Sequence, residues 1–144
     1  MQTFLPVADF AESARLLDRS RLGKQRVETL QILYALSDPK YGWQSHPAVR
    51  MWRGSDMWLA TYGMMVCGEW RARGYADGCL EKIMEIAERI KGHNLRPSWL
   101  GDERLHASHR AALLAKSPEW YGQWGWTEEA KIEYWWPGGH STQG

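Results

Sequence analysis

The stretch DGCLEKIMEIAERIKG, residues 77–92, gives the clearest indication of the fold. Its apolar side chains recur at the three- and four-residue spacing that marks one face of a helix. They are Leu80, Ile83, Met84, Ala87 and Ile90. Asp77 can begin this helix and Gly92 ends it. The pattern therefore predicts an amphipathic helix with one buried face.

Four more helices are predicted on either side of this stretch. Asp9 and Glu12 have the spacing of a capping box. Ser55 and Asp102 are residue types that cap the amino termini of helices. The predicted ranges are 9–18, 19–36, 55–73 and 102–116, with a helical turn at 48–53.

The two ends of the chain are predicted to be non-helical. Residues 1–7 are expected to be extended, because Pro6 restricts the backbone of the residue before it. Residues 120–144 are expected to be irregular and aromatic, with 138–144 as a frayed tail. No stretch shows the alternation of a strand over a useful length. We therefore predict an all-α fold in which residues 1–144 form a single compact domain of about five helices.

The composition of the 144 residues limits the function classes. A formal net charge of +1 excludes a strongly basic, non-specific nucleic-acid binder but allows a local basic face. Cys67 and Cys79 form no C-x-x-C pair, which fits a reducing cytoplasm. The chain shows neither the basic start of a signal peptide nor the ~18 consecutive apolar residues of a membrane span. We therefore expect a cytoplasmic protein without a membrane partner.

The helix predicted at 19–36 carries the most informative polar residues. They share one stripe, because they lie three, four and seven residues after the first of them. They are Arg21, Lys24, Gln25 and Glu28. Cations at this spacing can hold phosphates, and the carboxylate can stabilise a positive centre or move a proton. The same spacing is typical of ordinary ion pairs on a solvated face, so both interpretations stay open.

His106 and His109 lie three residues apart in the helix predicted at 102–116. A metal site would need further ligands, and no Cys or Asp cluster supplies them, so we predict no metal. Contacts from His109, Arg110 and Lys116 to phosphates are the more natural function of this region. Structural hydrogen bonding is the alternative.

The run SPEWYGQWGW, residues 117–126, interleaves aromatic residues with glycine. The chain has ten Trp and two Phe, and a Trp ring can serve a core, an interface or a platform for stacked bases. Stacking here would use Trp120, Tyr121 and Trp124. The alternative is a lid that closes a small core.

Three segments, taken together, point to one known family. They are LLDRSRLGKQRVE at 16–28, SHP at 45–47 and SPEWY at 117–121. In these segments the chain resembles the pyrimidine-dimer DNA glycosylase (phage endonuclease V) family. It is most similar to an actinobacterial-type branch, whose members start with a similar Thr-Phe-Leu-Pro segment and carry Arg-Leu-Gly-Lys-Gln.

The resemblance implies a compact helical glycosylase that acts on damaged or modified pyrimidines in double-stranded DNA and also cleaves at the abasic site. It implies no cofactor and no obligate protein partner. In this family an amino-terminal α-amine attacks the sugar C1′ to form a Schiff base, and a glutamate stabilises the cationic sugar. Glu28 falls at the position of that glutamate. Gln2 is bulky, so Met1 is expected to be retained, and its amine is the candidate nucleophile.

The resemblance also implies a set of DNA contacts. Arg21 and Gln25 fall where the family has polar groups facing DNA, and residues 118–121 match its aromatic loop near the damaged bases. Arg26 is the candidate most easily explained as structural, because it lies off the stripe. The candidates for phosphate or strand contacts are Arg21, Lys24, Gln25, Arg26, His46, Arg50, His109, Arg110 and Lys116, and those for stacking are Trp120, Tyr121 and Trp124.

Two other functions fit the same sequence. One is a DNA-binding module that keeps the scaffold without catalysis. The other is a protein-interaction domain whose Trp-rich end docks a partner, an alternative that the near-neutral net charge allows.

Overall fold

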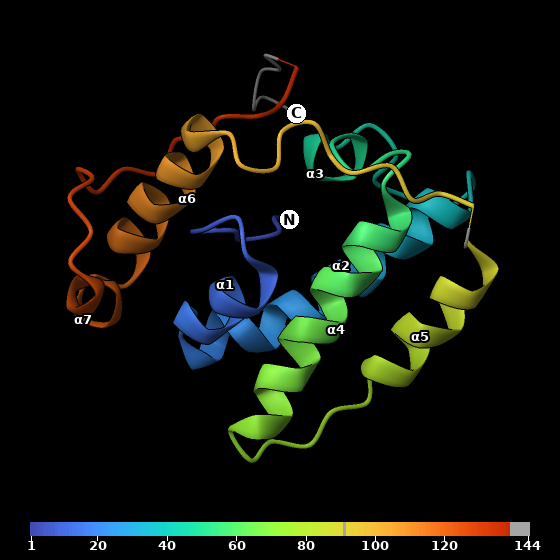
Figure 1. The fold of residues 1–144 in the computed structure, drawn as a ribbon, viewed down its shortest axis with the longest axis horizontal. Helices are drawn as coiled ribbons and strands as arrows, with labels where there is room; N and C mark the ends of the chain where they lie inside the picture. The colour runs from blue at the N-terminus through green and yellow to red at the C-terminus, as the bar shows by residue number, and fades with distance from the viewer. Residues whose placement is uncertain (91, 139–144) are drawn as a thin grey trace.

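The computed structural model describes residues 1–90 and 92–138, which form helices and loops with no strand (Figure 1). The helices are α1 (Phe10–Leu16), α2 (Arg19–Ser37), α3 (Pro47–Arg50), α4 (Asp56–Ala72), α5 (Leu80–Arg89), α6 (Glu103–Lys116) and α7 (Pro118–Tyr121), followed by a short 3-10 turn, η1 (Gly122–Trp124). The all-α fold class is confirmed. In the described ranges, no helix has both the length and the apolar character needed to cross a membrane.

The five predicted helices correspond to α1, α2, α4, α5 and α6, and the predicted turn corresponds to the shorter α3. α5 starts at Leu80 and not at Asp77, because the Asp77 carboxylate stands before the helix and accepts its first N–H groups. The segment 120–144, expected to be irregular, is helical at its start, because α7 begins at Pro118 and runs to Tyr121 and η1 follows it. Most of the predicted tail, residues 139–144, lies outside the described residues.

Two of the three predicted caps are confirmed. The Asp9 side chain accepts a hydrogen bond from the Glu12 N–H at 2.8 Å, and Asp102 accepts one from the Arg104 N–H at 3.0 Å. Ser55 stands at the N-cap position of α4, but its side chain makes no capping hydrogen bond. The predicted cap at Ser55 is therefore corrected to a position without a side-chain cap.

The helices α2 and α4 form the central pair, and α1 and α5 pack against α4. Gly63 allows this packing at the place where α2, α4 and α5 meet. A Cβ atom at Gly63 would lie 2.8 Å from Thr29 Cγ2 and 2.9 Å from Ile83 Cδ1, closer than side chains tolerate. The glycine thus permits the close approach of the three helices.

The first residues of the chain run as an extended segment between α6 on one side and α2 and α4 on the other (Figure 1). Gln2, Thr3, Phe4 and Leu5 are each at most 6% exposed. Since no strand lies beside this segment in the described ranges, its main-chain groups need partners from side chains. This requirement determines the geometry of the candidate site.

Asp77 joins three helices through its fully buried carboxylate. It lies 2.6 Å from Arg26 Nη1 of α2 and 3.6 Å from Arg71 Nη2 of α4. It also accepts hydrogen bonds from the N–H groups of Cys79 and Leu80 at the start of α5. Burial alone would raise the pKa of Asp77, but the hydrogen bonds from Arg26 and from these N–H groups hold it below its ordinary value.

We expect Asp77→Asn to lower the free energy of unfolding by about 2–4 kcal/mol, because the Arg26 guanidinium would lose its buried partner. Urea unfolding at pH 7 measures the change. The control is Glu85→Gln, which removes an exposed pair with Arg89 and should cost under about 0.5 kcal/mol. Equal effects of the two substitutions would contradict the assigned role of Asp77.

Candidate active site at the amino terminus

The α-amine of the chain lies beside the carboxylate of Glu28. Met1 N is 3.9 Å from Glu28 Oε1, and the Gln2 N–H donates a hydrogen bond to the same oxygen at 3.2 Å. The Met1 side chain is packed inward, with 4% of it exposed, while 22% of the Glu28 side chain is exposed. The structure thus brings together the two residues predicted to be catalytic.

Gln25 and Tyr62 hold the extended segment against α2 and α4. Gln25 Nε2 donates to Gln2 O at 2.8 Å, and Gln25 Oε1 accepts from the Phe4 N–H at 2.8 Å. The Tyr62 hydroxyl lies 2.8 Å from Phe4 O and 2.7 Å from Gln25 Oε1, so its one proton serves either acceptor. Burial raises the pKa of Tyr62 well above its ordinary value, which keeps this donor protonated.

Two histidines of α6 hold the next residue, Leu5. The Leu5 N–H donates to His109 Nδ1 at 2.9 Å, and Leu5 O lies 2.7 Å from His106 Nδ1. His106 Nε2 accepts from the Gly101 N–H, so its proton sits on Nδ1 and is donated to Leu5 O. His109 must present an unprotonated Nδ1, so the two neutral rings have opposite tautomers. Burial, with a smaller contribution from His106, lowers the pKa of His109 to about 3.

These placements favour the structural alternative for both histidines. His109 is fully buried and His106 is 2% exposed, so neither presents its ring to a phosphate in this structure. Gln25 is 1% exposed and bonds to the chain's own backbone, although the resemblance implied a contact with DNA. Within the described residues, no group of three or more His, Cys, Asp or Glu side chains could hold a metal ion.

A hollow of about 410 Å³ opens beside the amine and Glu28. Glu28 is the one carboxylate in its described wall, against three cationic side chains and the amine, so the wall carries an excess of positive charge. Tyr134, whose pKa burial raises to about 12, supplies a neutral hydroxyl. The lining residues are Met1, Gln2, Phe4, Ser20, Arg21, Lys24, Gln25, Glu28, Lys116, Ile132 and Tyr134.

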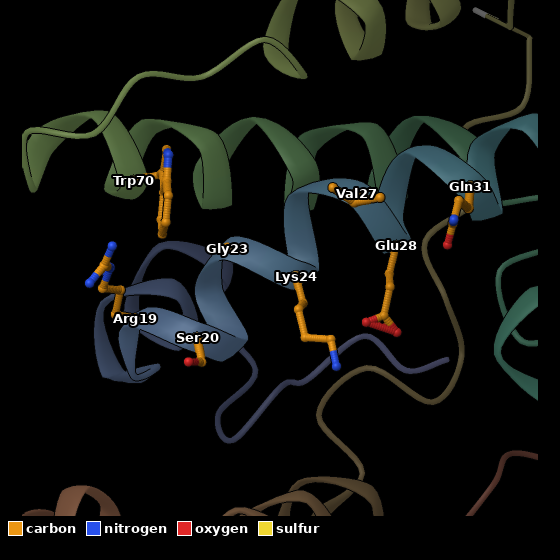
Figure 2. A pocket seen from close by; sticks show the side chains of 8 residues that line it. All are labelled: Arg19, Ser20, Gly23, Lys24, Val27, Glu28, Gln31 and Trp70. Atoms are coloured by element: carbon orange, nitrogen blue, oxygen red, sulfur yellow. The ribbon is translucent and has the colours of Figure 1, made fainter.

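A second, more open hollow of about 620 Å³ lies along the outer side of α2 (Figure 2). Lys24 and Glu28 line both hollows and extend from the same side of α2, as Figure 2 shows. Trp70 of α4 closes one end of the second hollow and approaches Gly23, whose missing side chain leaves room for the ring. Lys24 and Glu28 therefore both stand where the two hollows meet.

Two predicted cationic contacts are occupied by internal partners. Arg26 is paired with Asp77, and its guanidinium lies 4.3 Å from the centre of the Trp70 ring. Arg110 donates to Glu128 at 2.9 Å and to Pro6 O at 2.8 Å, and also pairs with Glu103. In contrast, Lys24 and Lys116 are exposed, and Arg21, which pairs with Asp18 at 3.2 Å, still lines the smaller hollow.

The predicted stacking residues pack against the end of α1 and the N-cap of α2. Tyr121 is fully buried, its hydroxyl donates to the Asp18 carboxylate, and its ring stacks on Trp126. Trp120 Nε1 donates to Leu16 O at 2.8 Å, and Trp124 lies under the Arg15 guanidinium. Tyr121 is covered in this structure, so this arrangement favours the lid alternative for that ring.

His46 caps the short helix α3 by accepting a hydrogen bond from the Ala48 N–H at 3.0 Å. Burial lowers the pKa of His46, and the positive charges of the amino terminus and of the exposed Arg50 lower it further. His46 therefore lies within electrostatic range of both the α-amine and Arg50.

Some residues of the site gave no signal in the sequence. Tyr134 and Ile132 reach the hollow from the carboxyl-terminal segment, and Trp52 Nε1 donates to Thr3 Oγ1 from the loop after α3. These residues lie in other segments of the chain, and no periodic sequence pattern relates them to Glu28. An apolar helix position such as Tyr62 is indistinguishable from ordinary core.

The model of one protein family, described as pyrimidine dimer DNA glycosylase, matches residues 1–82. The match includes the extended segment, α2 with Glu28, and α4 with Tyr62. No curated protein and no solved structure matches the chain.

We expect His109→Asn to make the free energy of unfolding fall less steeply as the pH is lowered from 7. The pKa of His109 lies at about 3 in the folded chain, below its ordinary value of 6.5, so the unfolded chain takes up a proton that the folded chain refuses. The contribution of the neutral His109 ring to the free energy of unfolding is fully present above about pH 6.5. It is lost as the pH falls toward 3, by up to about 1.4 kcal/mol per pH unit.

Urea unfolding between pH 7 and 4.5 measures this slope, and the Asn oxygen can still accept the Leu5 N–H. The control is His93→Asn, because 62% of the His93 side chain is exposed. An unchanged slope in His109→Asn would show that His109 is not held neutral.

Proposed function

The chain belongs to the pyrimidine dimer DNA glycosylase family, and from that premise we propose that it removes damaged or modified pyrimidines from double-stranded DNA and then cleaves the strand at the abasic site. The observation that carries the proposal is the α-amine of Met1, 3.9 Å from Glu28 Oε1 at the edge of a hollow with a positive wall. An amine and a carboxylate in this arrangement suit covalent catalysis at a sugar carbon.

In the proposed first step, the neutral amine of Met1 attacks C1′ of the damaged nucleotide. The bond from C1′ to the base breaks, and the base leaves with that electron pair and is protonated. Glu28 faces the positive charge that develops on the sugar and stabilises it through space. The C1′–O4′ bond then breaks as the sugar ring opens, O4′ takes up the remaining N–H proton, and a Schiff base forms between Met1 N and C1′.

In the proposed second step, removal of a proton from C2′ drives cleavage of the C3′–O bond and breaks the strand. Glu28 is the candidate base, because it is the carboxylate that lines the hollow beside the amine. Water then hydrolyses the Schiff base and restores the free amine. The buried side chain of Met1 supports a role for this residue in the mature site, since its packing fixes the position of the amine.

The charged residues of the wall support a DNA substrate. Arg21, Lys24 and Lys116 line the hollow that holds the amine, where they can contact the phosphates on either side of the reacting sugar. Gln25 and His109 serve the reaction in this proposal by holding the amino-terminal segment. Arg26 and Arg110 serve the fold through their carboxylate partners.

The test uses a duplex with one site-specific thymine dimer, with borohydride added to reduce and trap a Schiff base. We expect strand cleavage and a covalent adduct that peptide mass spectrometry maps to Met1. Glu28→Gln should slow cleavage by about 100-fold or more while DNA binding persists. Glu129→Gln, which removes an exposed carboxylate away from the hollow, should cleave like the unchanged protein.

Absence of cleavage and of adduct on both dimer-containing and abasic DNA would contradict the proposal. Binding without either product would favour a DNA-binding module on the same scaffold. An adduct on Gln2 would move the nucleophile by one residue, to the nitrogen that lies 3.2 Å from Glu28 Oε1.

A further inference from the structure

Trp43 differs from the other tryptophans of the chain in both exposure and backbone conformation. All ten Trp lie in the described ranges, and Trp43 alone is exposed, with 56% of its surface accessible. Its φ of 71° is also the one positive value among the described residues other than glycine. A bulky residue adopts this conformation at an energetic cost, which the surrounding structure has to offset.

The surrounding loop is held firmly by the next residue, Gln44. Gln44 Nε2 donates to the carbonyl oxygens of Ala35, Asp38 and Tyr41 at 2.7–3.0 Å. Its Oε1 and its main-chain oxygen both accept from Arg53 Nη2, at 2.8 and 3.1 Å. The exposed indole of Trp43 therefore projects from a loop that the hydrogen bonds of Gln44 hold in place.

A row of aromatic rings connects Trp43 to the candidate active site. Its ring lies 5.9 Å from that of His46, which lies 6.1 Å from that of Trp136. The Trp136 ring lies 5.8 Å from that of Tyr134, which lines the hollow with the α-amine. The three ring-to-ring distances limit the separation of Trp43 and Tyr134 to at most about five base pairs of duplex at ~3.4 Å per base pair.

The surface around this row is suited to an anionic ligand with flat apolar rings. Arg50 and Arg53 are exposed beside the loop, and the positive charges of Arg50 and of the amino terminus act on His46, the second ring of the row. DNA offers both phosphates and ring faces, and stacking on an aromatic side chain tolerates any base.

We propose that Trp43 stacks on a base of the duplex within a few nucleotides of the reacting sugar, and that the Tyr134–Trp136–His46 row connects this contact to the hollow. The inference rests on the proposed function, because it takes DNA as the ligand. It assigns stacking to a loop residue before α3 and not to the 120–124 segment, where Tyr121 is covered.

The test measures binding of a labelled duplex that carries a stable tetrahydrofuran analogue of an abasic site, by fluorescence anisotropy. We expect Trp43→Ala to raise the Kd by about 5- to 150-fold, the range found for loss of one stacked base. Trp43→Phe, which keeps a flat ring, should restore most of the affinity. Leu95→Ala, which truncates a side chain that is 71% exposed and lines neither hollow at α2, should bind like the unchanged protein.

The salt dependence of the Kd distinguishes two causes of a lower affinity in Trp43→Ala, the loss of a stacked base and the loss of a phosphate contact. The plot of log Kd against log salt should keep its slope in Trp43→Ala and shift as a parallel line, because no phosphate contact is removed. A Kd within twofold of the unchanged protein, or a loss of affinity explained by a smaller slope, would overturn the inference while the proposed function stands. If the unchanged protein neither binds this duplex nor traps on abasic DNA, the proposed function fails and this inference fails with it.

Discussion

An extended segment that is buried between helices must satisfy its peptide groups without a neighbouring strand, and the site depends on how this chain meets that constraint. Each buried group left unpaired would cost about 1–3 kcal/mol. Side chains of three helices take the place of the missing strand: Gln25 of α2, Tyr62 of α4, and the histidines of α6. The segment thereby also joins α6 to the α2–α4 pair.

The same hydrogen bonds restrict the position of the α-amine. The bonds at Gln2, Phe4 and Leu5 fix the path of the chain up to its first residue, so Met1 N has little freedom left. The side chains of Gln25, Tyr62 and His109 hold the segment without a charge, and the Glu28 carboxylate of α2 lies 3.9 Å from the amine. A nucleophile that is held in one orientation beside a carboxylate loses little entropy when it reacts. The hydrogen bonds that satisfy the buried segment therefore also serve the proposed chemistry.

Features set by local spacing could be predicted from the sequence, and features set by what covers a surface could not. The long helices follow from periodicity, and the stripe on α2 does place Arg21, Lys24 and Glu28 along one hollow. Gln25 belongs to the same stripe yet is buried, because spacing tells which residues share a face and not whether a distant segment lies on it. His109 shows the same limit, since its partner Leu5 is 104 positions away.

The aromatic residues extend this reasoning to the surface. Composition predicts many large rings, but the exposure of each ring depends on which other segments cover it. Trp120 and Tyr121 find theirs at Leu16, the last residue of α1, and at Asp18, the N-cap of α2. The aromatic segment therefore fixes the first turn of the helix that carries Glu28, and it bears on the site through that helix. Trp43 has no such cover, and a loop held by Gln44 keeps its ring in solvent at the cost of a strained backbone.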